Sequence, residues 1–172
     1  MAATFVVEDG TRPAGANSYI SVADADQYDL NFINSTTWQA LSPEEKQMVL
    51  RKSTKYLDAA YSDKWKGIPV DSQQALDYPR FEVIDENGYY RDSAIIPQEL
   101  KDATVEMAIK ALAEDIIPDI ANPGAVSSYS VSVGPVSEST SYVGGNTPIK
   151  YYRKVDRILL PLLTISSKVF RG

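Results

Sequence analysis

Serine is the commonest residue in this sequence that could act as a nucleophile, and the chain contains seventeen of them. A catalytic serine needs a neighbouring base, yet the sequence has no histidine, and without cysteine it also lacks a thiol nucleophile. None of the serines lies in a Gly-x-Ser-x-Gly turn. A serine–lysine pair such as Ser53 and Lys52 is a poor candidate, because adjacent residues of a helix point in different directions.

Paired carboxylates are a second arrangement that could do chemistry, as the general acid and base of a glycosidase. The sequence has such pairs at Asp24 with Asp26 and at Glu114 with Asp115. Both pairs fall at predicted helix ends, where the helix dipole and solvation account for acidic residues. The sequence also lacks a phosphate-binding loop, a dinucleotide motif and an EF-hand loop. We therefore predict that the protein is not an enzyme and needs no cofactor and no metal ion.

The formal net charge of −6 is unevenly distributed. Residues 1–147 are acidic overall, whereas residues 148–172 hold six basic residues and one acidic residue. This asymmetry predicts that the basic segment docks on a negative surface: a neighbouring copy, a partner protein or a phosphate backbone. A solvated charged helix is the alternative. The chain has no apolar run long enough for a membrane span, and its first residues do not resemble a signal peptide.

Tyrosine is abundant, with eleven in the chain, and several lie in segments rich in serine and glycine. Tyrosine buries a large area at low entropic cost and keeps a polar end, which suits protein interfaces. Filling of the core is the alternative, and it fits Tyr28 and Tyr56 better than the serine-rich segment. The predicted partner interface consists of Tyr129, Val131, Val133, Tyr142, Tyr151, Tyr152, Arg153, Lys154, Arg157 and Phe170.

Local signals place two helices in the first third of the chain. Ser21 is a predicted N-cap for a helix over residues 22–32. Ser42 precedes Pro43 and is followed three residues later by Glu45, which is the pattern of a capping box. The second helix should run to residue 62.

Residues 97–117 are apolar on most sides, which predicts a buried central helix. Pro97 suits its first turn, and Pro118 is expected to end it. On its narrow polar strip, Glu106 lies four residues before Lys110, where the two side chains are expected to pair.

The remaining segments predict smaller elements. Residues 71–76 are expected to form a short helix, and residues 81–96 a hairpin around an Asn-Gly turn, with a structured loop as the rival. Residues 127–142 alternate between apolar residues and serine, which predicts a two-stranded ribbon. Residues 151–163 have the pattern of an amphipathic helix.

The predicted fold is mainly α with a small β part: a helical bundle with a β-hairpin or extended arm and a C-terminal helix and tail. The predicted division is a body with an N-terminal arm over residues 1–120, a ribbon and glycine hinge over 121–147, and a basic helix and tail over 148–172.

A basic cluster on the predicted helix 43–62 offers a nucleic-acid alternative. The cluster comprises Lys46, Arg51, Lys52 and Lys55, and two tyrosines lie nearby in the sequence. Nearby acidic residues partly cancel these charges, so a solvated helix face is the competing interpretation.

The order of several segments resembles the head-to-tail connector, or adaptor, proteins of tailed bacteriophages, a family sometimes labelled DnaT-like ssDNA-binding. Each segment is weakly specific by itself, but together they cover most of the chain. One departure is Tyr78, where the family pattern has a tryptophan before Pro-Arg. The matching segments are GANSYISVADADQY (15–28), LRKSTKYLDAAY (50–61), KWKGIPVDSQQALDYPR (64–80), IIPQELKDATVEMA (95–108), SVSVGPVSESTSY (130–142) and VDRILLPLL (155–163).

The resemblance implies a ring of identical subunits, usually twelve, in the neck of the virion. Such a ring docks on the portal protein, joins the DNA-filled head to tail or nozzle proteins, and lets double-stranded DNA pass without sequence-specific binding. The C-terminal segment of such proteins commonly reaches the portal or the adjacent subunit. Two alternatives remain open: a single-stranded DNA-binding or replication accessory protein, and another ring protein of the neck or tail terminus.

Overall fold

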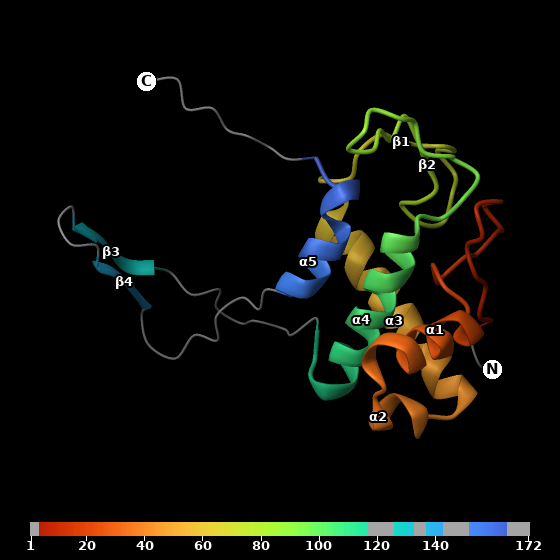
Figure 1. The fold of residues 1–172 in the computed structure, drawn as a ribbon, viewed down its shortest axis with the longest axis horizontal. Helices are drawn as coiled ribbons and strands as arrows, with labels where there is room; N and C mark the ends of the chain where they lie inside the picture. The colour runs from red at the N-terminus through yellow and green to blue at the C-terminus, as the bar shows by residue number, and fades with distance from the viewer. Residues whose placement is uncertain (1–3, 117–125, 133–136, 143–151, 165–172) are drawn as a thin grey trace. The chain divides into compact units, whose positions relative to one another are not determined.

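The structure is a computed structural model that describes residues 4–116, 152–164 and the strands at 126–132 and 137–142, the latter without side chains. The chain divides into two compact units. One unit combines residues 1–116 with residues 153–172 and is called the body here, and the other is formed by residues 117–152. The described elements are mainly α-helical with a small β part, as the sequence predicts (Figure 1).

The first helical segment begins where the sequence places it and ends differently. Ser21 caps α1 (Val22–Tyr28) by accepting a hydrogen bond from the Asp24 amide at 3.1 Å. The chain then continues as a π-helical turn, η1 (Asp29–Ile33), and the amide of Asn34 donates to the carbonyl of Asp29 at 2.6 Å. A four-residue helix, α2 (Thr36–Gln39), follows and carries the buried Trp38, although the sequence analysis expected no helix there.

The two longest helices, α3 (Pro43–Tyr61) and α4 (Gln98–Ala113), form the centre of the body. The capping box of α3 is present, since Ser42 and Glu45 exchange hydrogen bonds with each other's backbone. The prediction of a buried central helix is confirmed, because α4 packs against α1, α2, α3 and α5. Its predicted end is wrong: the helix stops at Ala113, and Glu114 is already extended.

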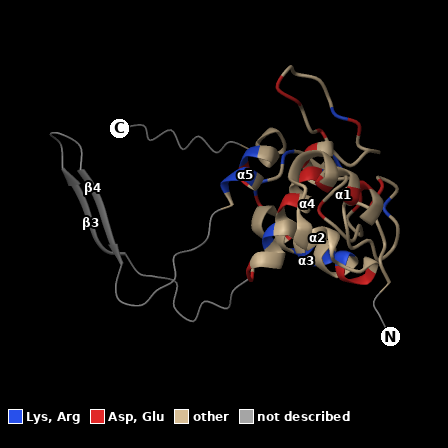
Figure 2. Ribbon diagram, turned by 60° about the horizontal axis from the view of Figure 1, so that its bottom comes forward, with Lys and Arg blue, Asp and Glu red and all other residues tan. Residues whose placement is uncertain are grey.

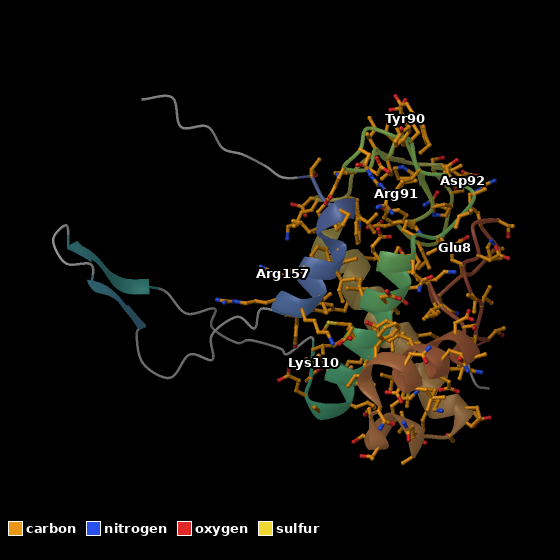
Figure 3. All side chains as sticks on the ribbon, in the orientation of Figure 1. Glu8, Tyr90, Arg91, Asp92, Lys110 and Arg157 are labelled. Carbon is orange, nitrogen blue, oxygen red and sulfur yellow. The ribbon has the colours of Figure 1, made fainter. Side chains whose placement is uncertain are left out.

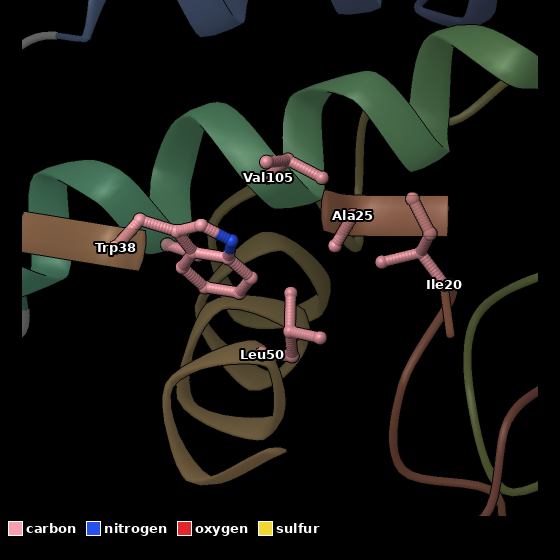
Figure 4. Close-up of a cluster of buried hydrophobic side chains, with 6 residues drawn as sticks. Ile20, Ala25, Trp38, Leu50 and Val105 are labelled. Atoms are coloured by element: carbon pink, nitrogen blue, oxygen red, sulfur yellow. The ribbon is translucent and has the colours of Figure 1, made fainter. Parts of the chain in front are cut away.

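A hydrophobic cluster fills the space between α1, α2, α3 and α4 (Figure 4). Trp38, Leu50 and Val105 are fully buried in it, and Ile20 and Ala25 complete the side of α1. The indole nitrogen of Trp38 donates to the Asp26 carboxylate at 2.8 Å, so the one polar atom of this large side chain is satisfied.

The segments around α3 and α4 are irregular but tightly packed. The two-residue strands β1 (Ile68–Pro69) and β2 (Arg80–Phe81) pair antiparallel. The short helix predicted over residues 71–76 is wrong, because Asp71 and Gln74 form turns through side-chain hydrogen bonds to the backbone. The N-terminal segment packs closely on this region: Gly10 has φ +103°, and a Cβ there would lie 1.8 Å from the Ala94 carbonyl oxygen.

The second unit contains the predicted ribbon. β3 (Val126–Ser132) pairs antiparallel with β4 (Ser137–Tyr142), with an irregularity between Val126 and Ser128. In the described part of the chain these two strands form a sheet of their own, with no third strand.

The C-terminal helix belongs to the body, whereas the sequence analysis assigned it to a separate segment over 148–172. α5 (Arg153–Leu159) continues into a 3₁₀ turn, η2 (Leu160–Leu162), and packs along α4. Val155, Leu159 and Leu162 are buried, as the predicted amphipathic pattern requires, whereas Ile158 and Leu163 are half-buried. Figure 2 shows that much of the α5 ribbon is basic, while acidic residues are spread over α1 and α4.

Candidate interaction surfaces

The basic helix α5 is held on the body by polar contacts as well as by its apolar face. Tyr61 on α3 donates a hydrogen bond to Asp156. Lys66 donates to the Pro161 carbonyl at 2.9 Å, and Trp65 forms a β-bridge with Leu163. Contacts from residues at least 95 positions away in the sequence therefore fix the orientation of α5.

Glu106 of α4 has a different environment from the one predicted. Its side chain is buried, and its Oε1 lies 2.5 Å from the Lys154 ammonium group and 3.0 Å from the Tyr28 hydroxyl, which donates to it. The prediction that Glu106 pairs with Lys110 is therefore wrong, because Lys154 is its cationic partner. A buried carboxylate is destabilising unless a cation pairs with it. Here Lys154 of α5, from a distant part of the sequence, is that cation. Burial beside Glu106 raises the pKa of Tyr28 well above its usual value.

The outward face of α5 carries the other predicted basic residues. Arg153 and Arg157 are exposed, and Lys154 is exposed along its side chain although its end reaches Glu106. Leu160 continues the stripe and is 51% exposed. Residues 153, 157 and 160 follow the i, i+4, i+7 spacing of one helix face, opposite the buried Val155 and Leu159. Figure 3 shows the Arg157 side chain extending away from the body.

The described residues among the remaining predicted interface positions belong to the second unit. Tyr129 and Val131 lie on β3, where they pair with Thr140 and Glu138 of β4. Tyr142 ends β4 opposite Val126, and Tyr152 directly precedes α5 and is half-buried. Three predicted residues fall outside the described part of the chain: Val133, Tyr151 and Phe170.

A second exposed surface, which the sequence analysis did not include, is the loop that follows β2. Tyr89 and Tyr90 are each 72% exposed at its turn, and Phe81 and Ile84 are partly exposed beside them. The adjacent tyrosines after an Asn-Gly turn were the signal that could have indicated this surface. We call residues 81–92 the acidic aromatic loop, because it carries exposed aromatic side chains together with the exposed carboxylates of Glu82, Glu86 and Asp92.

The acidic aromatic loop is held in one conformation by its own hydrogen bonds. The Asp85 carboxylate accepts from the amides of Asn87 and Tyr89 at 2.9 Å each, and Gly88 has φ +86°. Ile84 and Tyr90 form a single antiparallel bridge. The Arg91 guanidinium makes two hydrogen bonds to the carboxylate of Glu99 at 2.7 and 3.0 Å. The predicted hairpin is thus reduced to one bridge within a structured loop.

Most basic residues of the cluster predicted on α3 interact with other residues of the same chain. Lys46 pairs with Asp26 at 2.9 Å and Lys52 pairs with Asp115 at 2.9 Å. Arg51 also has an interaction partner. These contacts favour the interpretation of the cluster as part of the folded body.

A half-buried carboxylate on the same helix, Asp58, has hydrogen-bond partners from two other segments. Asp58 accepts a hydrogen bond from the Tyr19 hydroxyl and a second from the Asp77 amide at 3.3 Å. It lines a pocket of 320 Å³ together with residues of the N-terminal segment. Burial, reinforced by the nearby charge of Asp77, raises the pKa of Asp58 to about 7.

We expect the body to lose stability as the pH rises from 5 to 8. In the unfolded chain Asp58 releases its proton near pH ~4, whereas the folded protein retains it up to about pH 7. The folded state therefore binds the extra proton between these values, and stability falls by about 1 kcal/mol per pH unit within that window. Urea unfolding at pH 5 and pH 8 measures this, and Asp58→Asn should remove the difference. An unfolding free energy that depends equally on pH in the native chain and in Asp58→Asn would show that Asp58 is not the group responsible.

Two further kinds of site were sought among the described residues. No cluster of three or more acidic side chains there has the geometry to hold a metal ion. None of the described helices is both long and apolar enough to cross a membrane.

Comparison with known protein families gives a match that extends over residues 3–172. It is to the family described as "Putative DnaT-like ssDNA binding protein". The chain belongs to this DnaT-like family. Comparison with curated proteins and with solved structures gave no match.

The DnaT-like family match covers both compact units, so the ribbon and α5 belong to the family pattern as well as the helices of the body. The predicted relationship is confirmed at the level of this family. Its description names single-stranded DNA binding, which fits the alternative of the sequence analysis better than a connector ring. The connector role stays a prediction.

Proposed function

We propose that this DnaT-like family protein is a structural, non-enzymatic subunit of a ring, of the phage head-to-tail connector type. In this role, identical copies close into a ring that docks on a portal protein, contacts tail proteins, and surrounds double-stranded DNA in the virion. The ribbon formed by β3 and β4 is the observation that carries the proposal.

A two-stranded ribbon is at best marginally stable in water when nothing else covers it. Within the described residues β3 and β4 pair with each other alone, so each strand has one edge of unpaired backbone groups. Such edges accept a strand or another surface from a neighbouring chain. An assembly of identical copies supplies that neighbour to every subunit at once.

The body supports an assembly role in two ways. Exposed aromatic side chains at the acidic aromatic loop offer area for protein contacts, with Tyr89 and Tyr90 each 72% exposed. The net charge of −6 would repel the phosphates of a duplex, so DNA would slide through a channel lined by such subunits rather than adhere to it. Sedimentation velocity tests the proposal: a ring subunit gives a multiple of the 19.0 kDa chain mass, and a protein that stays monomeric at every concentration overturns it.

Single-stranded DNA binding is the second candidate, and the family description is the observation that favours it. The structure offers exposed tyrosines for base stacking and exposed arginines on α5 for phosphate contacts. Two features weigh against it. Lys46 and Lys52 of α3 are already paired with carboxylates, and the exposed tyrosines lie among acidic residues.

We expect the purified protein to bind single-stranded DNA weakly or not at all. Fluorescence anisotropy of a labelled oligonucleotide at low salt, repeated at rising salt, measures this. A non-specific binder at physiological salt has a dissociation constant of roughly 10⁻⁴ to 10⁻⁶ M, and its affinity falls steeply with salt. Binding in that range with a steep salt slope that Arg153→Gln and Arg157→Gln reduce would favour the second candidate.

A further inference from the structure

We propose that neighbouring copies of this chain associate head to tail, with the acidic aromatic loop of one copy docked on the outer face of α5 of the next. This inference rests on the proposed ring assembly and names the contact that would build it. Both surfaces belong to the body.

The loop surface has the features of a preformed interface. Tyr89 and Tyr90 are each 72% exposed, and Phe81 is 38% exposed. Large aromatic side chains held this far out of a folded body are typical of sites that contact another protein. The Asp85 hydrogen bonds fix the turn, and the Arg91 amide donates to the Val83 carbonyl at 2.8 Å. The loop therefore loses little conformational entropy when it binds a partner.

The loop is also strongly negative. Glu82, Glu86 and Asp92 are exposed on it, and Asp85 is half-buried. Arg91 is its basic residue, and the two hydrogen bonds to Glu99 occupy that charge. The partner of this surface should therefore combine positive charge with an apolar side chain.

The outer face of α5 has that composition. Arg153, Arg157 and Leu160 form one exposed stripe, while the opposite stripe is buried against α4. The orientation of α5 is fixed by the contacts of Asp156 and Pro161 with α3 and the segment after it. Positive charge opposite negative charge would speed the encounter of the two surfaces and set their register.

The two surfaces occupy different places on the body, as a head-to-tail contact requires. Figure 3 shows Tyr90 at the tip of the loop and Arg157 projecting from the outer side of α5. A head-to-tail contact leaves one surface of each kind free on every pair, and its repetition produces either a closed ring or a filament. A two-fold dimer would instead use both surfaces of both copies and stop at two subunits.

Cysteine cross-linking tests the contact without background, because the chain has no cysteine of its own. Glu86→Cys and Arg153→Cys lie at the edges of the two surfaces and leave the tyrosines and Arg157 in place. We expect the double variant to give a ladder of disulfide-linked dimers, trimers and larger species under mild oxidation. A mixture of the two single variants should give mainly cross-linked heterodimers. Met48→Cys, at an exposed position of α3, replaces Glu86→Cys in the control and should give no ladder.

Charge reversal provides the second measurement. Arg153→Glu with Arg157→Glu, and separately Glu82→Lys with Glu86→Lys, should each weaken self-association at least tenfold in sedimentation velocity. Combining the four changes should restore association. If the native chain assembles but neither reversal nor cross-linking has an effect, this contact is wrong and the ring proposal survives. If the native chain remains monomeric and no cross-links form, both are wrong.

Discussion

Two consecutive prolines in the ribbon, Ser130→Pro with Val131→Pro, are expected to weaken assembly at least tenfold while leaving the helical body folded. Ser130 and Val131 pair with Ser139 and Glu138 in the antiparallel ladder. Consecutive residues of a strand direct their amides to opposite edges, so one proline removes a hydrogen bond within the ribbon and the other removes a donor from its outer edge. With no third strand in the described sheet, nothing there compensates for the loss.

The effect on the two units should be separable. Residues 117–152 form a compact unit distinct from the body, so the unfolding free energy of the body should change by less than about 0.5 kcal/mol. Assembly measured by sedimentation velocity should fall at least tenfold, because the edge that receives the neighbour is lost. The matched control Ser130→Thr with Val131→Ile keeps residues that favour strands and should assemble normally. Full assembly of the proline variant would show that the ribbon does not join the subunits.

Trp38→Ala should have the largest effect on the stability of the body, with a loss of about 3–5 kcal/mol. The indole is fully buried against Leu50 and Val105, and its removal leaves a cavity between α3 and α4. It also leaves Asp26 without the hydrogen bond from the indole nitrogen, and Lys46 without the ring 5.4 Å from its ammonium group. Because domains of this size are typically stable by about 5–15 kcal/mol, this variant would be close to unfolding.

Urea unfolding followed by circular dichroism measures that loss. Phe32→Ala is the matched control, since Phe32 lies on the neighbouring η1 turn but is 72% exposed. Phe32 contacts the ring of Tyr28 at a centroid distance of 5.0 Å. Loss of this contact and of little buried area should lower the unfolding free energy by less than about 1 kcal/mol. Similar losses in both variants would show that Trp38 is not the centre of the core.

The starts of the helices were predictable because their signals are local. Ser21 and Ser42 cap the helices that follow them, and Pro97 immediately precedes the first residue of α4. The end of α4 was not predictable from Pro118, since the chain turns to an extended conformation at Glu114. The helix α2 escaped prediction because four residues are too few to show a periodic pattern, although they place Trp38 in the core.

The partners of polar side chains could not be predicted, since they come from distant segments. Glu106 was expected to pair with Lys110 one turn away, but the fold brings Tyr28 and Lys154 to it instead. The amphipathic pattern of residues 151–163 places Arg153 and Arg157 on the exposed side of α5, because helix periodicity alone separates them from the buried face. The adjacent tyrosines after the Asn-Gly turn mark the position of the exposed loop, but the contact that holds Arg91 comes from Glu99 of α4, which no local pattern encodes.

Electron microscopy of the purified protein can show whether this DnaT-like family protein forms a ring. Negatively stained fields, recorded over a range of protein concentrations, would show the particles end-on and from the side. We predict annular particles with a central channel wide enough for a DNA duplex, with twelve subunits as the expected number. Compact single particles without a channel at every concentration, together with filaments of regular spacing on added single-stranded DNA, would contradict the ring proposal.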